Sequence, residues 1–293
     1  MLTALLQIAV GVVLLYYGAN LLVRGSSRLA ASFGVAPAVI GLTVVAFGTS
    51  LPELVVSVTA ALQGSADIAL GNVVGSNIAN VGLILGLGAC LRAMTVEFTL
   101  LKREVPMGLG AVALVVLLSA DGVLGRIDAL VLLAGFCGFL FWSVAVQRHA
   151  PEGVQEAYSP GGQDATGKGK DGACALCGLV GVLLGGHWLV AGGISVAGAL
   201  GVPAVVIGLT VIAVGTSLPE LAASLVAVAR GEDDIGIGNV LGSNLFNLLG
   251  ILGVAALFDP IAVPATFFRF QYPVLAAFAL ALLPIMRTGM GIS

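Results

Sequence analysis

The residues with the clearest capacity for chemistry are two glutamates inside long apolar stretches. Glu53 and Glu220 end two copies of the hexapeptide GTSLPE, at residues 48–53 and 215–220. A carboxylate inside a membrane-spanning segment is costly to bury and by default indicates a functional site. Two such carboxylates placed together would repel each other unless a cation or a proton joined them. The pair therefore predicts a site that binds positively charged species.

Hydroxyl groups accompany each glutamate at helical spacing. In both copies a threonine and a serine precede the glutamate by four and three residues. Side chains at this spacing share one face of a helix. The hydroxyl groups concerned are those of Thr49, Ser50, Thr216 and Ser217.

Each hexapeptide also contains a proline that should break its helix. Proline has no N–H and its ring pushes the preceding turn open, so Pro52 and Pro219 should release backbone carbonyls. Such a break is tolerated at membrane depth only where it faces protein or a wet cavity. The released carbonyls, in residues 46–49 and 213–216, are then free to coordinate a cation.

A second polar stripe follows each hexapeptide in the motif GNVxGSNxxN. Polar residues recur there every four positions, at Asn72, Ser76 and Asn80 and again at Asn239, Ser243 and Asn247. The two motifs together offer carboxylate, hydroxyl, amide and backbone oxygens, a ligand set that suits hard cations such as Ca²⁺ or Na⁺. For Asn72 and Asn239 the sequence leaves two roles open, cation ligand or helix-to-helix hydrogen bond.

The elements that position these residues are predicted to be membrane-spanning helices. The 293 residues are 59% hydrophobic and 9% charged, whereas soluble domains carry about 25% charged residues. This composition predicts an all-α polytopic membrane protein. The net charge of −3 and the lack of a dense basic patch argue against nucleic acid as a partner.

Apolar segments separated by charged or Gly/Pro-rich breaks predict about nine transmembrane helices. They cover residues 2–23, 36–62, 67–91, 105–120, 127–147, 173–197, 203–229, 234–258 and 266–286. The polar stretch 148–172 is predicted to be a flexible linker. Lys and Arg collect on the linker's side of the membrane, with only Arg126 and Arg269 opposite. The positive-inside rule therefore predicts a cytoplasmic linker and an extracytoplasmic N-terminus.

The two motif copies belong to a long internal repeat. Residues 41–90 align without a gap onto 208–257, with roughly 28 of 50 positions identical. The copies begin five segments apart, and an odd separation reverses the direction of the second copy, so we predict two inverted-topology repeats of five helices. The first covers residues 1–147 and the second 173–293. Because residue 293 corresponds to Arg126 at the repeat offset, the second repeat is expected to lack its last helix.

The doubled motif resembles the α-repeats of the cation/Ca²⁺ exchanger superfamily, and within it the prokaryotic sodium/calcium antiporter branch. The resemblance covers nearly the whole chain. It implies two five-helix halves whose central helices form the ion sites, with the first and sixth helices sliding across that core. It also implies antiport of Na⁺ and Ca²⁺ across the plasma (inner) membrane, with no cofactor and no obligate protein partner.

Carried over residue by residue, the resemblance implies a ligand set. The Ca²⁺ ligands would be the carboxylates of Glu53 and Glu220 and the backbone oxygens of Thr49 and Thr216. The Na⁺ sites would add Ser50, Ser217, Ser76, Ser243 and the carbonyls of Ala46 and Ala213. Asn80 and Asn247 would border the centre, where family members often carry an aspartate. With two carboxylates, one Ca²⁺ or two Na⁺ would neutralise the site, and the Na⁺ stoichiometry stays open.

Two other functions compete with this interpretation. Glutamates also carry protons, so exchange of H⁺ for Ca²⁺ is the alternative within transport, although the threonine–serine pairs favour Na⁺. An intramembrane hydrolase with Ser50 or Ser217 as nucleophile would need a general base within reach. The histidines, His149 and His187, are not duplicated as the serines are. We therefore predict a transporter and not an enzyme.

Overall fold

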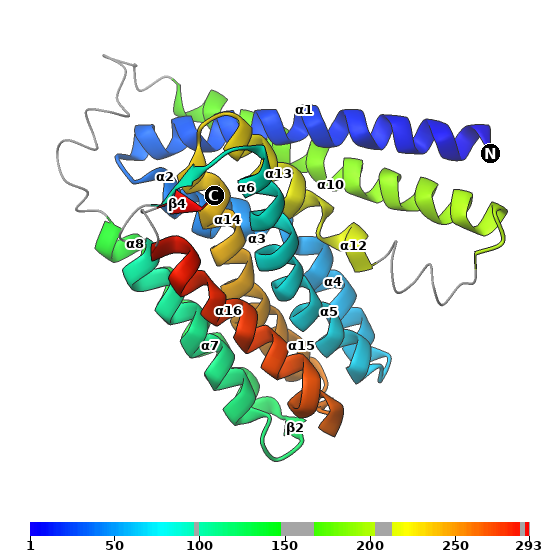
Figure 1. The fold of residues 1–293 in the computed structure, drawn as a ribbon, viewed down its shortest axis with the longest axis vertical. Coiled ribbons are helices and arrows are strands. Elements are labelled where there is room, and N and C mark those ends of the chain that lie inside the picture. The colour runs from blue at the N-terminus through cyan, green and yellow to red at the C-terminus, as the bar shows by residue number, and fades with distance from the viewer. Residues whose placement is uncertain (97–99, 148–166, 203–212, 288–290, 293) are drawn as a thin grey trace.

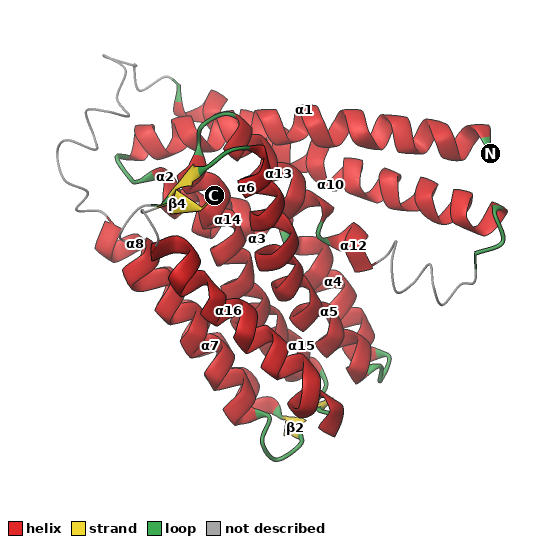
Figure 2. Ribbon diagram, in the orientation of Figure 1, coloured by secondary structure: helices red, strands yellow, loops and turns green. Residues whose placement is uncertain are grey.

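The chain folds into helices, and a pair of long ones crosses a bundle formed by the rest. The computed structural model describes residues 1–96, 100–147, 167–202, 213–287 and 291–292. Helices account for nearly all of these residues, with four two-residue strands (Figure 2). The long helices α1 (Leu2–Phe33) and α10 (Lys168–Ala199) lie side by side across one edge of the bundle (Figure 1).

The bundle is assembled from two series of shorter helices, in which η marks a π-helical turn. The first series is α2 (Pro37–Ile40), η1 (Gly41–Val45), α3 (Ala46–Thr49), α4 (Leu51–Leu62), α5 (Ala66–Ala79), η2 (Asn80–Leu85), α6 (Gly86–Leu91), η3 (Leu100–Glu104), α7 (Val105–Leu118) and α8 (Arg126–Gln147). The second is α12 (Ala213–Thr216), α13 (Leu218–Ala229), α14 (Asp233–Leu245), η5 (Phe246–Ile251), α15 (Leu252–Phe258), η6 (Phe267–Gln271) and α16 (Tyr272–Arg287). Seven elements of the first series, from α3 to α7, correspond in order to the seven of the second, near the offset of the sequence repeat.

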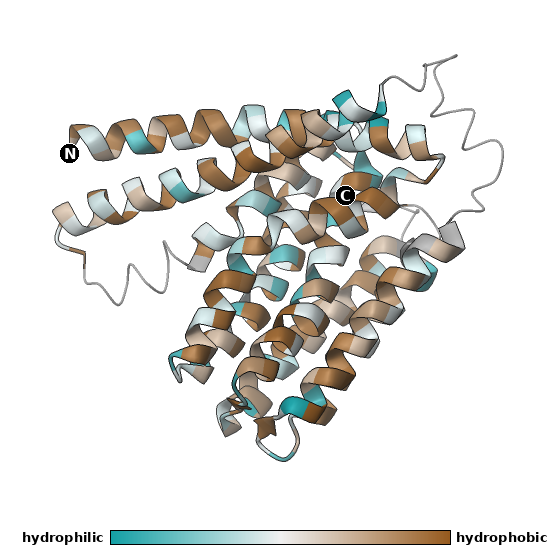
Figure 3. Cartoon of the chain, turned by 180° about the vertical axis from the view of Figure 1, so that it is seen from behind, coloured by the Kyte–Doolittle hydropathy of each residue, from teal (hydrophilic) through white to brown (hydrophobic). Residues whose placement is uncertain are grey.

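Large apolar side chains cover the outer faces of these helices. Leu5, Tyr17 and Phe141 are 52%, 63% and 76% exposed, and hydrophobic residues colour most of the length of the helices in Figure 3. Soluble proteins rarely expose so much contiguous apolar surface, so these faces are suited to lipid. The chain is therefore a helical membrane protein, as its composition predicted.

The number of spans can be counted only over part of the chain. The described residues contain six helical segments long and apolar enough to cross a membrane, or seven if the bent pair Pro37–Thr49 and Leu51–Leu62 counts as one span. Helix α7, with 14 residues, is by itself too short to count as a membrane span. Residues 203–212 of another predicted span lie outside the described residues. The count of nine stays a prediction.

The two long helices extend beyond the apolar segments that predicted them. Helix α1 continues past residue 23 to Phe33, where Gly34 adopts a left-handed conformation (φ 65°) and caps it. Helix α10 begins at Lys168, inside the predicted linker, whose residues 148–166 lie outside the described residues. A hydropathy window ends at the first charged residue, whereas a helix ends at its cap, so both helices were predicted too short.

Glycines hold α1 and α10 in backbone contact. They recur every two helical turns, at Gly11, Gly18 and Gly25 on α1 and at Gly178, Gly185 and Gly192 on α10. A Cβ on Gly18 would lie 2.7 Å from the backbone nitrogen of Val182, and a Cβ on Gly185 would lie 2.6 Å from that of Leu15. Small residues allow such close approach of helices in lipid. The antiparallel pair therefore forms one unit.

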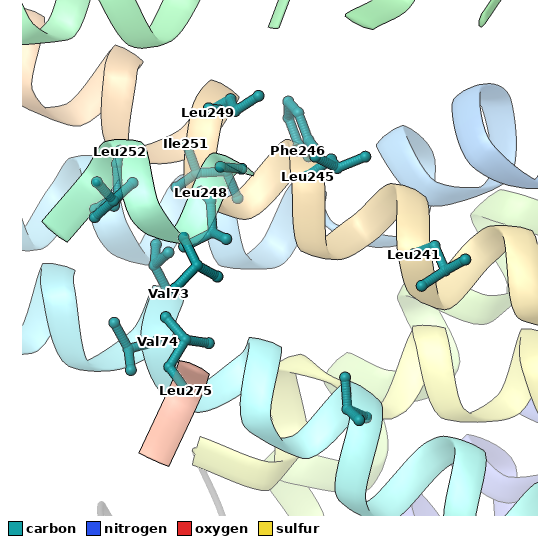
Figure 4. Packing of buried hydrophobic residues seen from close by; sticks show 14 of the residues in the cluster. Val73, Val74, Leu241, Leu245, Phe246, Leu248, Leu249, Ile251, Leu252 and Leu275 are labelled. Atoms are coloured by element: carbon teal, nitrogen blue, oxygen red, sulfur yellow. The ribbon is translucent and has the colours of Figure 1, made fainter. Parts of the chain in front are cut away.

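The hydrophobic core of the bundle lies around α14 and η5. Leucine and phenylalanine side chains of this segment meet side chains of α5 and α16 (Figure 4). Among them are Leu245 and Phe246 of the segment, Val73 of α5 and Leu275 of α16, all less than 5% exposed. This packing fixes the segment that carries the second GNVxGSNxxN motif.

Short strands join the two series of helices at opposite ends of the bundle (Figure 1). Strand β1 (Met94–Thr95) pairs with β4 (Gly291–Ile292), and β2 (Val123–Leu124) pairs with β3 (Ile261–Ala262), both antiparallel. Each pair combines one strand from the first series with one from the second. Next to β1, Asp233 accepts a hydrogen bond from the backbone of Thr95 at 2.9 Å and forms an ion pair with Arg92.

Candidate functional site

Both hexapeptides fold as a break between two short helices. Ser50 separates α3 from α4 with φ −85° and ψ 11°, and Ser217 separates α12 from α13 with φ −86° and ψ 4°. The segments on either side of the first break are bent by 47°. Both prolines stand in the first turn of the following helix, where their missing N–H costs nothing. The predicted interruption of the helix is therefore present in both copies.

The two breaks meet, and each serine bonds the glutamate of the other copy. Ser50 Oγ donates to Oε1 of Glu220 at 2.6 Å, and Ser217 Oγ lies 3.3 Å from Oε1 of Glu53. Ser217 Oγ is also 3.4 Å from Oγ of Ser76. Both glutamates are only 1% exposed. Residues far apart in the chain thus form one buried cluster of carboxylates and hydroxyls.

The asparagines behind the glutamates make hydrogen bonds between helices. Asn239 donates from Nδ2 to Ser224 Oγ at 2.9 Å and to the carbonyl of Glu220 at 3.4 Å. The hydroxyl of Thr49 lies 3.2 Å from Oδ1 of Asn239 and can donate to it. Asn72 makes the equivalent bonds to α4. Of the two roles that the sequence left open for these asparagines, the structure therefore contains the helix-to-helix hydrogen bond.

Several residues predicted for the ion site carry buried oxygens without a hydrogen-bond partner. Among the described residues, no hydrogen-bond partner exists for Oε2 of Glu53, Oε2 of Glu220, Oγ of Ser243, Oδ1 of Asn80 and Oδ1 of Asn247. Native proteins leave few buried polar atoms unpaired. All five oxygens can act as acceptors, and the Nδ2 donor of Asn247 is also without a partner among these residues. The excess of unpaired acceptors indicates a place for a cation.

The backbone oxygens suggested for this site are less available. The carbonyl of Ala46 already accepts the N–H of Ser50 at 3.1 Å, and the hydroxyl of Thr49 lies 3.3 Å from it. Ala213 is the first residue of α12 and follows residues 203–212, which lie outside the described residues. Thr216, its last residue, lies beside Glu53. Among the described residues, most of the oxygens available to a cation at this site therefore belong to side chains.

A cavity and a covering helix adjoin the cluster. The cavity has a volume of about 230 Å³ and is lined by Asn72, Ser76 and Ser217, among others. Helix α10 covers both breaks. A Cβ on Gly48 would meet Leu179, and a Cβ on Gly186 would lie 3.5 Å from the ring of Pro219. Any movement of α10 would therefore change what covers the cluster.

The acidic groups limit which ions the cluster suits. The described residues hold no group of three or more carboxylate, imidazole or thiolate side chains. A cation bound here would be held by two carboxylates and neutral oxygens. Such all-oxygen coordination favours Ca²⁺ or Na⁺ over transition metals.

Sequence reasoning missed two asparagines of the second motif. Asn77 and Asn244 recur in register in GNVxGSNxxN, and Asn244 accepts a hydrogen bond from Nδ2 of Asn80 at 3.0 Å. Their duplication could have identified them, because an asparagine that recurs at equivalent positions of two apolar segments is as informative as the duplicated serines. Both asparagines lie outside the four-residue spacing that defined the polar stripe.

The chain is similar to known proteins over nearly its whole length. A family model described as sodium/calcium exchanger protein matches residues 3–145 and 172–290. The chain is 40% identical over 292 residues to the putative antiporter CaxA of Alkalimonas amylolytica, across 99% of this chain and 92% of the relative. It is 34% identical over 319 residues to the sodium/calcium exchanger MaX1 of Methanosarcina acetivorans, across 97% and 91%. A solved structure of the sodium-calcium exchanger NCX_Mj, soaked with 10 mM Na⁺ and zero Ca²⁺, matches with a TM-score of 0.88 and 35% identity, across 100% of this chain and 93% of that one.

Proposed function

Because the chain belongs to the sodium/calcium exchanger protein family, we propose that it exchanges Na⁺ for Ca²⁺ across the plasma (inner) membrane by alternating access. It is a transporter and not an enzyme. The observation that carries the proposal is the crosswise contact of the two breaks, where Ser50 and Ser217 each bond the other copy's glutamate. A buried pair of carboxylates with unpartnered oxygens is suited to a divalent cation.

In this proposal Ca²⁺ lies between the carboxylates of Glu53 and Glu220. Ca²⁺ takes six to eight oxygen ligands, and the remaining ones would come from neutral oxygens of both copies. Those we assign are the backbone oxygens of Thr49 and Thr216. Na⁺ would use the hydroxyls of Ser50, Ser217, Ser76 and Ser243, the carbonyl of Ala213, and the carbonyl of Ala46 once its present bonds open. Asn80 and Asn247 border the centre and supply unpartnered oxygens.

We also propose that the two series of helices are inverted repeats, 1–147 and 173–293, with nine spans. The strand pairs support this, because β1–β4 and β2–β3 lie at opposite ends of the bundle and each joins both series. The basic residues support the orientation. Arg92 and Arg230 lie at the β1–β4 end, whereas Arg126 and Arg269 follow β2 and β3. The β1–β4 end would face the cytoplasm.

The choice of Na⁺ over H⁺ can be tested with purified protein in liposomes. We expect radiolabelled Ca²⁺ to accumulate when the liposomes are loaded with Na⁺ and diluted into Na⁺-free medium. The threonine and serine hydroxyls beside both glutamates motivate this expectation, since they are ligands for Na⁺ that a proton does not need. A pH gradient alone should give no uptake above protein-free liposomes. Uptake driven by the pH gradient would establish the alternative, H⁺/Ca²⁺ exchange.

The charge of the site predicts electrically neutral exchange. Asn80 and Asn247 are neutral, so one Ca²⁺ or two Na⁺ would balance Glu53 and Glu220, and a third Na⁺ would leave an uncompensated buried charge. We expect Na⁺-driven Ca²⁺ uptake to keep its rate when a K⁺ diffusion potential of either sign is imposed with valinomycin. Acceleration by one sign and slowing by the other would show that a net charge crosses with each cycle.

A further inference from the structure

A third buried glutamate lies outside the central cluster. Glu104 ends η3 at the start of α7 and is 2% exposed. It lines a cavity of about 30 Å³ between α5, α7, α14 and α16. Its Oε2 has no hydrogen-bond partner among the described residues. Neither exchange motif contains this residue, and the exchange mechanism proposed above does not use it.

The cavity offers this carboxyl group acceptors but little else. Leu109, Val112, Leu241 and Phe278 contribute to its mostly apolar wall. Asn77 also lines the cavity. Its Nδ2 donates to the carbonyl of Val73 at 2.7 Å, and its Oδ1 has no partner among the described residues. Two acceptors without a donor thus share one small space.

We propose that Glu104 is a proton-binding site, in which the carboxyl group is held as the neutral acid and its O–H donates within the cavity. A metal ion does not fit, because Ca²⁺ needs six to eight oxygens and the described lining supplies only Glu104, Asn77 and Asn244. The volume is that of about one water molecule. An ionised carboxylate against this apolar wall would be costly.

The equivalent position in the second series supports a neutral group. At the repeat offset, Glu104 corresponds to Gln271, and each is the last residue of its π-helical turn, η3 and η6. The side-chain oxygen of Gln271 is also buried without a partner among the described residues. Glutamine has the shape of a protonated glutamate but can never ionise. The second half therefore carries, at the position equivalent to Glu104, a side chain of this shape that stays neutral.

Other charged or titratable groups on the packed elements do not line the cavity among the described residues. Helix α7 carries none, whereas η3 itself carries Lys102 and Arg103, and the positive charge of Arg103, the chain neighbour of Glu104, acts on its carboxyl group. The groups on the other elements are Asp67 of α5, Tyr272 and Arg287 of α16, Asp233 and Asp234 of α14, and Arg126 and Asp128 of α8. Tyr272 bonds Ser119 at the other end of α7, Asp128 accepts the N–H of Gly125, and Asp233 pairs with Arg92.

One hydrogen bond between asparagines connects the Glu104 cavity with the proposed ion site. Asn244 lines the cavity and accepts the hydrogen bond of Asn80 at 3.0 Å, and Asn80 borders the proposed ion site. An ionised Glu104 would attract the amide N–H groups of Asn244 and draw this side chain toward the cavity, away from Asn80. Loss of the proton at alkaline pH would thus loosen the contact between η2 and α14.

The experiment compares the thermal unfolding of wild type and Glu104→Gln in detergent from about pH 5 to pH 9. An acid that stays neutral when folded ionises above about pH 4.3 in the unfolded chain. The unfolded state then binds fewer protons than the folded state, so stability falls as pH rises. We expect the Tm of wild type to fall relative to the variant by roughly 2–5 °C per pH unit. Parallel curves would overturn the proposal.

A reciprocal variant and a transport assay complete the test. Gln271→Glu should add a second pH-dependent fall in Tm, and a curve parallel to wild type would contradict the need for a neutral group at these equivalent positions. Because both readings come from unfolding, they stand apart from the outcome of the transport experiments. In liposomes, Glu104→Gln should retain more of its neutral-pH Ca²⁺ uptake at alkaline pH than wild type does.

Discussion

Replacing Glu53 with glutamine should reduce Na⁺-driven Ca²⁺ uptake to the level of protein-free liposomes. The variant keeps the shape of the side chain and the contact with Ser217, but removes one of the two buried negative charges. Loss of one partner of a buried charge pair costs about 2–5 kcal/mol, so Ca²⁺ affinity should fall roughly 30- to 5,000-fold. The measurement is initial uptake of radiolabelled Ca²⁺ over a range of Ca²⁺ concentrations.

Glu220→Gln should behave alike, because the two carboxyl groups are equally buried and hold equivalent positions in the repeat. A matched control is Asp121→Asn, which removes a carboxylate from the exposed turn before β2. It should transport at the wild-type rate. If either glutamine variant kept more than half of the wild-type affinity, the buried pair would not be the Ca²⁺ site.

Replacing Gly18 with alanine should separate α1 from α10 and stop transport. The added Cβ would lie 2.7 Å from the backbone nitrogen of Val182 and 2.8 Å from the backbone of Gly181. Backbone atoms cannot rotate away as a side-chain end can, so the helices must move apart. Overpacking typically costs about 1–3 kcal/mol, and we expect a fall in Tm of roughly 2–12 °C together with lost Ca²⁺ uptake.

The control for this variant is Gly138→Ala in α8. A Cβ there would meet nothing within 4 Å among the described residues, while the gain in helix propensity is the same as at Gly18. It should match or exceed wild type in Tm and transport normally. Normal transport by Gly18→Ala would mean that backbone contact between α1 and α10 is dispensable.

Much of the membrane fold and of the candidate cluster followed from the sequence, because its signals are duplicated. A proline in an apolar segment indicates little alone, but Pro52 and Pro219 in register with Glu53 and Glu220 predicted paired breaks, and the structure contains both. Residues 170 positions apart, Ser50 and Glu220, came together as the repeat implied. Their roles as ion ligands stay predictions.

Other features depend on packing that sequence patterns do not reveal. The π-helical turns η2 and η5 arise where asparagines sit between packed helices, and neither composition nor periodicity distinguishes them from α-helix. The direction of each hydrogen bond of Asn239 likewise depends on which helix lies opposite. The glycines of α1 and α10 were visible in the sequence, but a spacing of two turns gains meaning only when the partner helix is known.

The strand pairs restrict how ions reach the cluster. Because β1 pairs with β4 at one end of the bundle and β2 pairs with β3 at the other, strands join the two series of helices at both ends. Pairing at both ends opposes a hinge motion that would separate the two series. We therefore propose that ions reach the cluster through movement of the α1–α10 pair, which lies outside the bundle, and not through separation of the two series.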